Sequence, residues 1–129
     1  MKGRLHFCSV APSFMVNDVS ATMRWYETNL GFTADPFPEK EPFVFAILAR
    51  DEIEIMLQRI EGYQKPDLSP LRPAGVWDAY IRMEGVKEFY ELVRARVPIK
   101  APLTKRPYGD WEFEIIDPNG YVLVFSELV

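Results

Sequence analysis

The sequence predicts an α+β domain made of two copies of one strand–helix–strand–strand–strand (βαβββ) module. Three observations carry this prediction. Helical spacing of apolar residues recurs at an offset of 67 residues, and strand alternation recurs at an offset of 68. The third observation is a stretch rich in proline and glycine between the two halves. One half cannot bury the apolar face of its sheet alone, so the two modules are expected to pack together.

Length and composition limit the classes of protein to consider. The chain has 129 residues, of which 48% are hydrophobic, enough for one domain with a sizeable core. Its net charge of −4, without a basic stripe, disfavours nucleic acid as a partner. No apolar run approaches the ~20 residues of a membrane span. We therefore expect a soluble, cytoplasmic protein that binds neither nucleic acid nor membrane.

Two helices are predicted from apolar residues spaced i, i+4, i+7 and i+11, which fall on one helix face. The helical residues are Val19, Met23, Tyr26 and Leu30 in the first module and Val86, Tyr90, Val93 and Val97 in the second. Asn17 and Asp18 are helix-start residues, and Gly31 follows the first helix as a C-terminal cap. Pro98 ends the second helix, since proline cannot continue it.

Strands are predicted where apolar and polar residues alternate or where β-branched and aromatic residues cluster. The predicted strands are Phe7–Val16, Phe32–Ala34, Phe43–Ala49, Ile53–Gln58, Trp77–Met83, Trp111–Ile116 and Tyr121–Ser126. Pro118 and Gly120 suit a type I turn with a following bulge, because proline presets φ and glycine supplies the positive φ. We expect module one at residues 1–58, a linker without regular structure at 61–75, and module two at 75–129.

The only histidine, His6, and the only cysteine, Cys8, exclude several kinds of site. One chain cannot build a two-histidine facial triad, a three-histidine zinc site or a disulfide from these residues. His6 is expected to be structural or exposed. Cys8 has the strand parity of Val10, Phe14 and Val16, so a buried core thiol is expected.

Two such modules that close on the run DPNGYVLVF resemble the vicinal oxygen chelate superfamily, also called the glyoxalase/bleomycin resistance/dioxygenase superfamily. The residues that carry the resemblance are Val16–Asp18, Trp25-Tyr26, Leu30–Phe32, Tyr108-Gly109, Phe113, Asp117–Gly120 and Leu123–Phe125. The resemblance covers nearly the whole chain. It implies helices on one face of the sheets and a ligand cleft on the other, within one chain or across two. It is less specific for function, because this fold carries many activities.

The resemblance also implies where a metal would bind. In the metal enzymes of this superfamily, one ligand stands on the first strand and one on the last strand of each module. The matching positions here are Ala11, Met56, Asp78 and Val124. Only Asp78 has a side chain that ligates metals, so no metal and no other cofactor is predicted. This departure from the metal enzymes argues against glyoxalase I and extradiol dioxygenase activity.

Strand alternation assigns residues to the predicted cleft. Val10, Phe14 and Val16 are expected to face the helices. The residues expected on the cleft side are Ser9, Ala11, Ser13, Met15, Val44, Ala46, Leu48, Glu54, Met56, Gln58, Asp78, Tyr80, Arg82, Glu112, Glu114, Val122 and Val124. The drug-binding relatives line this groove with aromatic residues, so Trp77 and Trp111 are added, although either ring could simply cover the rim. Charged cleft residues could also lie at strand ends in water.

The predicted ligand-binding residues are therefore Ala11, Ser13, Met15, Glu54, Met56, Trp77, Asp78, Tyr80, Arg82, Trp111, Glu114 and Val124. Lys100, Lys105 and Arg106 are interpreted as a solvated basic loop. Acidic and aromatic cleft residues predict a small organic ligand that is cationic or aromatic. The superfamily usually completes its clefts by pairing chains, so a homodimer is expected.

Three functions remain open. The first is metal-free binding or sequestration of a small molecule, as in the bleomycin-resistance branch. The second is a lyase or isomerase, rather than a dioxygenase, with a divalent metal on a rearranged carboxylate set of Glu54, Asp78 and Glu114. The third is a metal-free enzyme that uses Glu54 or Asp78 as a general base. We expect a binding protein, with these two residues as the catalytic candidates if the chain is an enzyme.

Overall fold

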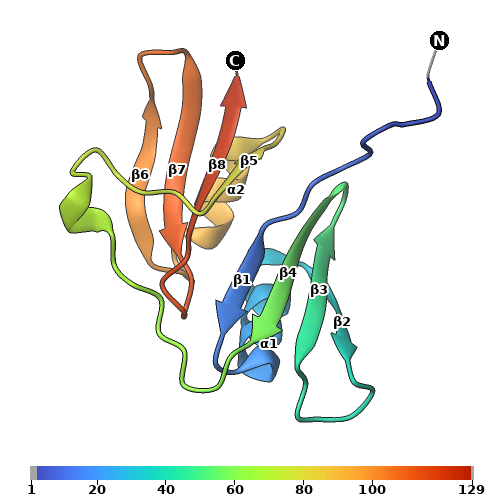
Figure 1. The fold of residues 1–129 in the computed structure, drawn as a ribbon. Helices are drawn as coiled ribbons and strands as arrows, with labels where there is room; N and C mark the ends of the chain where they lie inside the picture. The colour runs from blue at the N-terminus through green and yellow to red at the C-terminus, as the bar shows by residue number, and fades with distance from the viewer. Residues whose placement is uncertain (1–2, 129) are drawn as a thin grey trace.

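In the computed structural model, which describes residues 3–128, the chain folds into two four-stranded mixed sheets, each with one helix (Figure 1). The elements are β1 (Ser13–Val16), α1 (Val19–Leu30), β2 (Thr33–Phe37), β3 (Phe45–Arg50), β4 (Ile53–Arg59), the 3-10 helix η1 (Ser69–Leu71), β5 (Ala79–Arg82), α2 (Val86–Val93), β6 (Ile99–Lys105), β7 (Asp110–Ile116) and β8 (Val122–Leu128). Sheet one has the order β1-β4-β3-β2 and sheet two the order β5-β8-β7-β6. In each sheet the first strand pairs in parallel with the last, and the other pairs are antiparallel. The predicted pair of βαβββ modules in an α+β fold is confirmed.

Helix α1 has the predicted ends. The Asp18 side chain accepts a hydrogen bond from the Ala21 backbone N–H at 2.9 Å and caps the first turn. Gly31 has a φ of 70°, the left-handed conformation that glycine adopts without a Cβ clash. A polar cap at one end and a glycine at the other therefore fix the length of this helix.

Helix α2 is shorter than predicted, because it ends at Val93 and not at Val97. The chain continues in a turn in which the Val97 N–H donates to the Val93 carbonyl, and Val97 remains buried. Pro98 stops any continuation of the helix beyond this turn, since the residue before a proline avoids the helical conformation. At the other end Gly85 has no side chain to cap the helix. The Glu127 carboxylate of β8 instead accepts hydrogen bonds from the Gly85 and Val86 N–H groups.

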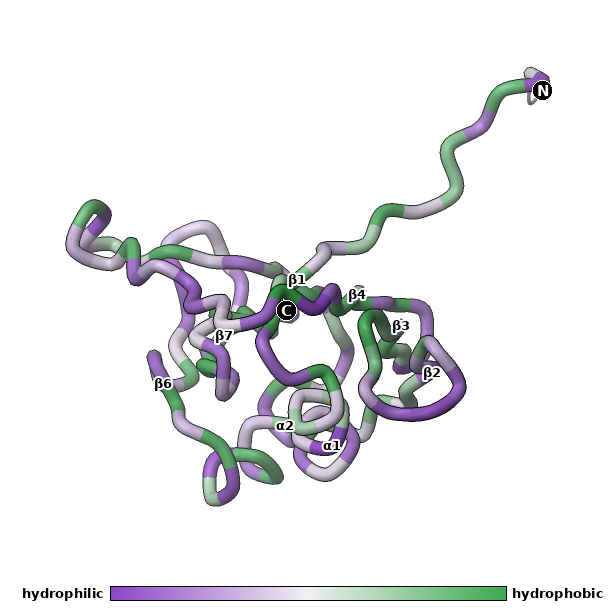
Figure 2. Tube along the Cα trace, turned by 60° about the horizontal axis from the view of Figure 1, so that its bottom comes forward, coloured by the Kyte–Doolittle hydropathy of each residue, from purple (hydrophilic) through white to green (hydrophobic). Residues whose placement is uncertain are grey.

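The first predicted strand, Phe7–Val16, is wrong over most of its length. Pairing begins at Ser13, opposite Met56, and the preceding residues lie outside both sheets in an extended segment that leaves the body (Figure 2). Cys8 is exposed, not buried, and Val10 is 95% exposed and does not face a helix. A strand needs a neighbouring strand for its hydrogen bonds, and residues 3–11 have none within the described chain.

Two other segments are more regular than expected. Strand β2 continues to Phe37, beyond the predicted end at Ala34, and pairs with β3. The predicted basic loop is in fact strand β6, which contains Lys100 and Lys105 and pairs with β7 through two register shifts. The fourth strand of sheet two therefore comes from a stretch that contains proline and two lysines.

The helix-covered faces of both sheets join in one hydrophobic core. Phe14 of β1 stacks on Tyr121 of module two, with 4.1 Å between ring centroids. The buried Tyr26 hydroxyl donates to Asp117 Oδ2 at 2.7 Å, and the Tyr121 hydroxyl donates to the Met15 carbonyl at 2.7 Å. Because the helix-covered faces share this core, the opposite face of each sheet, called here its open face, points away from it.

The face assignment of β3 requires a correction. Ala46 and Leu48, which were expected in the cleft, are fully buried in the core. They are paired with the core residues Leu57 and Ile55, and directly paired residues share a face. The hairpin of module two contains one more residue between core positions, so β3 and β7 correspond at an offset of 67 and not 68. A shift of one residue reverses every side chain of a strand.

Candidate functional site

The open face of sheet two carries a set of buried acids. Glu112 and Glu114 of β7 occupy the predicted face, and Asp110 at the start of β7 joins them. All three carboxylates are almost fully buried and do not lie in water at strand ends. Tyr80 and Glu114 are both paired with Val124, which brings the aromatic residue of β5 and the acid of β7 to the same row of the open face.

Tyrosine hydroxyls satisfy part of this acidic set. The Tyr80 hydroxyl lies 2.9 Å from Asp110 Oδ2 and 2.8 Å from Glu112 Oε2, and it can donate to one of them at a time. The Tyr108 hydroxyl donates to Glu112 Oε1 at 2.6 Å. Burial, followed by the hydrogen bond to Glu112, raises the pKa of Tyr108. Burial also raises the pKa of Tyr80. Both phenols therefore stay protonated and can serve as donors at neutral pH.

Four basic side chains stand beside the acids of this region. Arg82 Nη1 lies 2.7 Å from Asp110 Oδ2, Arg106 Nε 3.5 Å from Glu112 Oε1, and Lys100 Nζ 4.0 Å from Glu114 Oε1. The fourth, Lys65 of the linker, lies 3.4 Å from Asp78 Oδ2. The predicted solvated loop residues Lys100 and Arg106 thus pair with buried carboxylates. Pairing offsets the cost of burying a charge, so these acids are largely neutralised within the chain.

Two aromatic rings stand above the acids and remain open to solvent. The Trp77 indole Nε1–H donates to Glu114 Oε2 at 3.2 Å, and the ring lies 5.2 Å from that of Tyr80. Trp77 is 41% exposed and Tyr108 is 54% exposed. Each ring is thus held at its polar end by a buried carboxylate, while part of the side chain faces outward. We call Trp77, Tyr80 and Tyr108 the aromatic platform.

The predicted site residues do not all lie on one face. Trp111 lies on the helix side of sheet two, packed against the core, with Lys87 Nζ of α2 4.3 Å from its ring centroid. Trp111 has the strand parity of the core residue Phe113, which explains this position. The residues found on the open face of sheet two or at its edge are Trp77, Asp78, Tyr80, Arg82, Glu114 and Val124.

The remaining predicted residues belong to module one. Ala11 precedes β1, while Ser13 and Met56 are paired on the open face of sheet one. Met15 is half-buried and Glu54 is exposed on the same side. The two groups of residues therefore lie on the open faces of two different sheets, each pointing away from the common core.

The rearranged metal set of Glu54, Asp78 and Glu114 is not assembled within residues 3–128. In that part of the chain no group of three or more acidic, histidine or cysteine side chains could hold a metal ion. Asp78 Oδ2 instead accepts a hydrogen bond from the Val122 N–H at 2.8 Å and pairs with Lys65. This carboxylate joins the linker to the start of β8, which gives Asp78 a structural role that needs no metal.

Sequence reasoning missed Asp110 and Tyr108 as parts of the site. Asp110 has the same strand parity as Glu112 and Glu114, and this signal could have added it to the predicted cleft residues. Tyr108 lies outside the strand, in the turn between β6 and β7, so alternation says nothing about its direction.

The family is established by a model that covers most of the chain. Residues 4–125 match the family model described as the Glyoxalase/Bleomycin resistance protein/Dioxygenase superfamily, and the chain belongs to this superfamily. No curated protein matches the sequence. Within residues 3–128, no helix has the length and apolar character needed to cross a lipid bilayer.

Solved structures confirm the fold. TioX from Micromonospora sp. ML1 is 19% identical with a TM-score of 0.74, over 95% of this chain and all of that chain (100%). A glyoxalase-related enzyme from Clostridium phytofermentans is 16% identical with a TM-score of 0.75, over 99% of this chain and 100% of the other. A bleomycin-binding protein from bleomycin-producing Streptomyces verticillus, solved with copper(II)-bleomycin, is 22% identical with a TM-score of 0.69, over 94% and 96% of the two chains. At these identities the likeness establishes the shared fold and nothing finer.

Proposed function

We propose that this protein binds a small aromatic molecule on the open face of sheet two and sequesters it without turnover or a metal. The observation that carries the proposal is the aromatic platform, in which partly exposed rings are anchored to buried acids. Rings that are already fixed lose little conformational entropy when a ligand stacks on them. Bleomycin-binding proteins among the structural neighbours support binding as the kind of activity.

The acids that anchor the aromatic platform, called here its floor, determine which ligand charge is favoured. Glu112 and Glu114 hold their carboxylates directly below Tyr108 and Trp77. Because Arg106 and Lys100 stand beside these acids, the floor does not require a cationic ligand. Among the described residues, an anionic ligand would find no unpaired cation here, because Arg82, Arg106 and Lys100 are each paired with an acid. We therefore expect neutral or cationic aromatic compounds to bind better than anionic ones.

The proposed binding unit is a homodimer. Three apolar side chains of the N-terminal segment are almost completely exposed: Leu5 at 92%, Phe7 at 100% and Val10 at 95%. The open face of sheet one is also apolar, with Met15, Phe45, Ile47 and Met56 only half-buried. Exposed apolar surface of this kind favours association. A second copy of the chain would cover it and would add a wall to the cleft over sheet two.

A thermal-shift panel tests the ligand proposal, because a bound ligand raises the melting temperature by mass action. The panel contains neutral, cationic and anionic aromatic compounds of similar size. Neutral and cationic members should raise the melting temperature of the parent, and Trp77→Ala should lose this response. Trp111→Ala serves as the matched control, since it removes the same ring from the other face of sheet two and should keep the response. Stabilisation by anionic compounds alone, or an unchanged response in Trp77→Ala, would reject the proposal.

Sedimentation velocity tests the dimer. The parent should sediment as a dimer, and Phe7→Asp combined with Val10→Asp should sediment as a monomer with an unchanged far-UV spectrum. His6→Asp in the same segment is the control for added charge. A monomeric parent at the concentrations used for binding would contradict the proposed assembly.

A further inference from the structure

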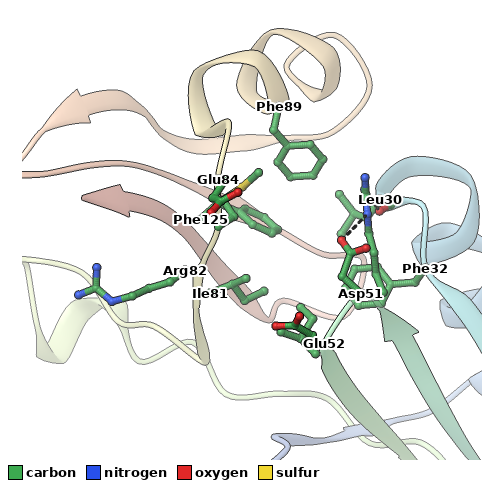
Figure 3. A pocket seen from close by; sticks show the side chains of 12 residues that line it. Leu30, Phe32, Asp51, Glu52, Ile81, Arg82, Glu84, Phe89 and Phe125 are labelled. Atoms are coloured by element: carbon green, nitrogen blue, oxygen red, sulfur yellow. Dashed lines mark hydrogen bonds and ion pairs between the residues drawn. The ribbon is translucent and has the colours of Figure 1, made fainter. Parts of the chain in front are cut away.

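We propose a second small-molecule site, specific for an organic cation, in the cavity where the two modules meet. The cavity has a volume of about 610 Å³ and is separate from the open face of sheet two. Module one contributes Leu30, Phe32 and Ile53 to its walls, and module two contributes Ile81, Phe89 and Phe125 (Figure 3). We call this cavity the inter-module pocket. Its size is in the range of pockets that hold drug-sized ligands.

Both arginines near the pocket are already engaged. Arg50 Nη1 donates to the Leu30 carbonyl at 2.7 Å, and its guanidinium carbon lies 5.6 Å from the Phe89 ring centroid. Arg82 points away from the cavity in Figure 3 and lies 2.7 Å from Asp110 on the open face. Neither guanidinium is therefore free to receive an anionic ligand in the pocket.

Two carboxylates at the pocket have no such partner. Glu52 lies in the turn between β3 and β4, and Glu84 lies between β5 and α2, so the two acids come from different modules. Among residues 3–128, neither has an ion-pair partner within 4.0 Å, whereas their neighbour Asp51 pairs with Arg50 at 3.8 Å. Two uncompensated negative charges therefore flank an apolar cavity.

This combination selects a ligand by charge as well as by shape. The pocket wall is apolar, and its Phe89 ring already lies 5.6 Å from the guanidinium carbon of Arg50, which shows that this wall accepts an organic cation. Glu52 and Glu84 add attraction for positive charge, which is stronger beside a low-dielectric wall than in bulk water. The fitting ligand class is an organic cation with an apolar or aromatic body. This inference does not depend on the proposed function, because Trp77, Tyr80 and Tyr108 do not line the pocket.

A pair of probes with the same shape and opposite charge isolates the charge requirement. Isothermal titration of the full chain would use tetraphenylphosphonium and, as its anionic counterpart, tetraphenylborate, at low ionic strength. In Trp77→Ala, which removes the aromatic platform as a competing site for aromatic cations, we expect tetraphenylphosphonium to bind at one site per chain and at least about tenfold more tightly than tetraphenylborate. Raising the salt concentration should weaken the binding of the cation, since exposed charges are screened.

Variants assign the binding to the inter-module pocket. Glu52→Gln combined with Glu84→Gln should weaken tetraphenylphosphonium binding at least about fivefold. Glu27→Gln combined with Glu39→Gln makes the same change in net charge at two exposed positions outside the pocket and should leave binding unchanged. Both pairs are compared in the Trp77→Ala background, so that binding on the aromatic platform does not mask binding in the pocket.

The variants distinguish a lost binding site from a loss of folding. All four substituted glutamates are exposed, so the variants should melt like the parent and a binding change would not reflect unfolding. Equal affinity for the two probes, or equal loss in the control pair and the pocket pair, would overturn the proposed site. Loss of cation binding in Trp77→Ala alone would place the cation on the open face instead and would equally overturn it.

Discussion

The open faces of the two sheets differ in chemistry although their backbones are equivalent. At the positions where β3 carries Phe45 and Ile47, β7 carries Glu112 and Glu114, 67 residues later in the chain. The two apolar residues of sheet one are half-buried, whereas the two acids of sheet two are almost fully buried. The acids can be buried because tyrosine, tryptophan and basic side chains surround them.

The helix-covered faces of the sheets remained alike. Ala46 and Leu48 in β3 correspond to Phe113 and Ile115 in β7, and all four are fully buried in the common core. A residue change on this side alters the packing of the common core, while a change on the open side leaves that core intact. The repeat therefore preserves the fold on one side and allows two different surfaces on the other.

The largest expected losses of stability come from substitutions on the two core faces, and they test whether these faces are equivalent. Phe125 packs at 5.0 Å from Phe89 and 5.3 Å from Phe113 between ring centroids, so Phe125→Ala should reduce the free energy of unfolding by about 3–5 kcal/mol. Leu57→Ala, at the equivalent position of β4, should cost about 2–5 kcal/mol. Urea denaturation measures both. A Phe125→Ala variant as stable as the parent would show that this side of β8 does not form the core.

A smaller loss of stability is expected for substitutions of acids on the open faces, and it should differ between the two sheets. Glu112→Ala leaves the Tyr108 hydroxyl without its acceptor and Arg106 without its ion-pair partner, which should cost about 1–3 kcal/mol. Glu54→Ala removes an exposed carboxylate from sheet one and should change stability by less than about 0.5 kcal/mol. Urea denaturation of both variants makes the comparison. Equal losses would mean that the acids of sheet two are no more integrated than a surface charge.

The two helix starts differ in the origin of their caps. Asp18→Ala removes a cap within α1, and Glu127→Ala removes a cap that reaches α2 from β8. Each should lower the free energy of unfolding by about 0.5–2 kcal/mol. Glu91→Ala, within α2 but away from its start, is the control. If Glu127→Ala matched that control, the contact from β8 would not stabilise α2.

The smallest effect concerns a bond between the modules and depends on pH. Burial raises the pKa of Tyr121 from 10.0 to about 12, so folding favours the protonated phenol. This contribution is fully present below pH 10.0 and is lost as the pH rises to about 12. Tyr121→Phe removes the hydrogen bond to the Met15 carbonyl, at a cost of about 0.5–1.5 kcal/mol at pH 8. Thermal melts from pH 8 to pH 12 should show a steeper decline for the parent than for Tyr121→Phe; parallel declines would contradict this role.

Sequence patterns were sufficient where the information is local. Asp18 and Gly31 bound α1 because capping depends on residues next to the helix. The turn at Asp117–Gly120 forms as predicted, with a φ of 90° at Gly120. The same turn misled the assignment of β3, since its extra residue changes the offset between the modules by one. The alternation pattern, counted from the wrong offset, then assigned Ala46 and Leu48 to the wrong face of the sheet.

The site depended on contacts that no local pattern encodes. From the sequence alone, Glu112 and Glu114 could lie in water at strand ends. Their burial could not be predicted, because Arg106, Lys100 and the tyrosines reach them from other segments of the chain. The N-terminal segment has the alternation of a strand, but strand pairing requires a neighbour that residues 3–128 do not supply. Burial of charge and pairing of edges are properties of the assembled fold.

The most direct test of the central claim observes the three tryptophan indole N–H signals during a ligand titration. Trp77 lies on the open face of sheet two, Trp111 on its other face, and Trp25 in α1. In ¹⁵N-labelled protein titrated with an aromatic compound that raises the melting temperature, the Trp77 signal should shift in a saturable way. The signals of Trp25 and Trp111 should stay in place. A titration that moves Trp111 or Trp25 and leaves Trp77 unchanged would contradict binding on the aromatic platform.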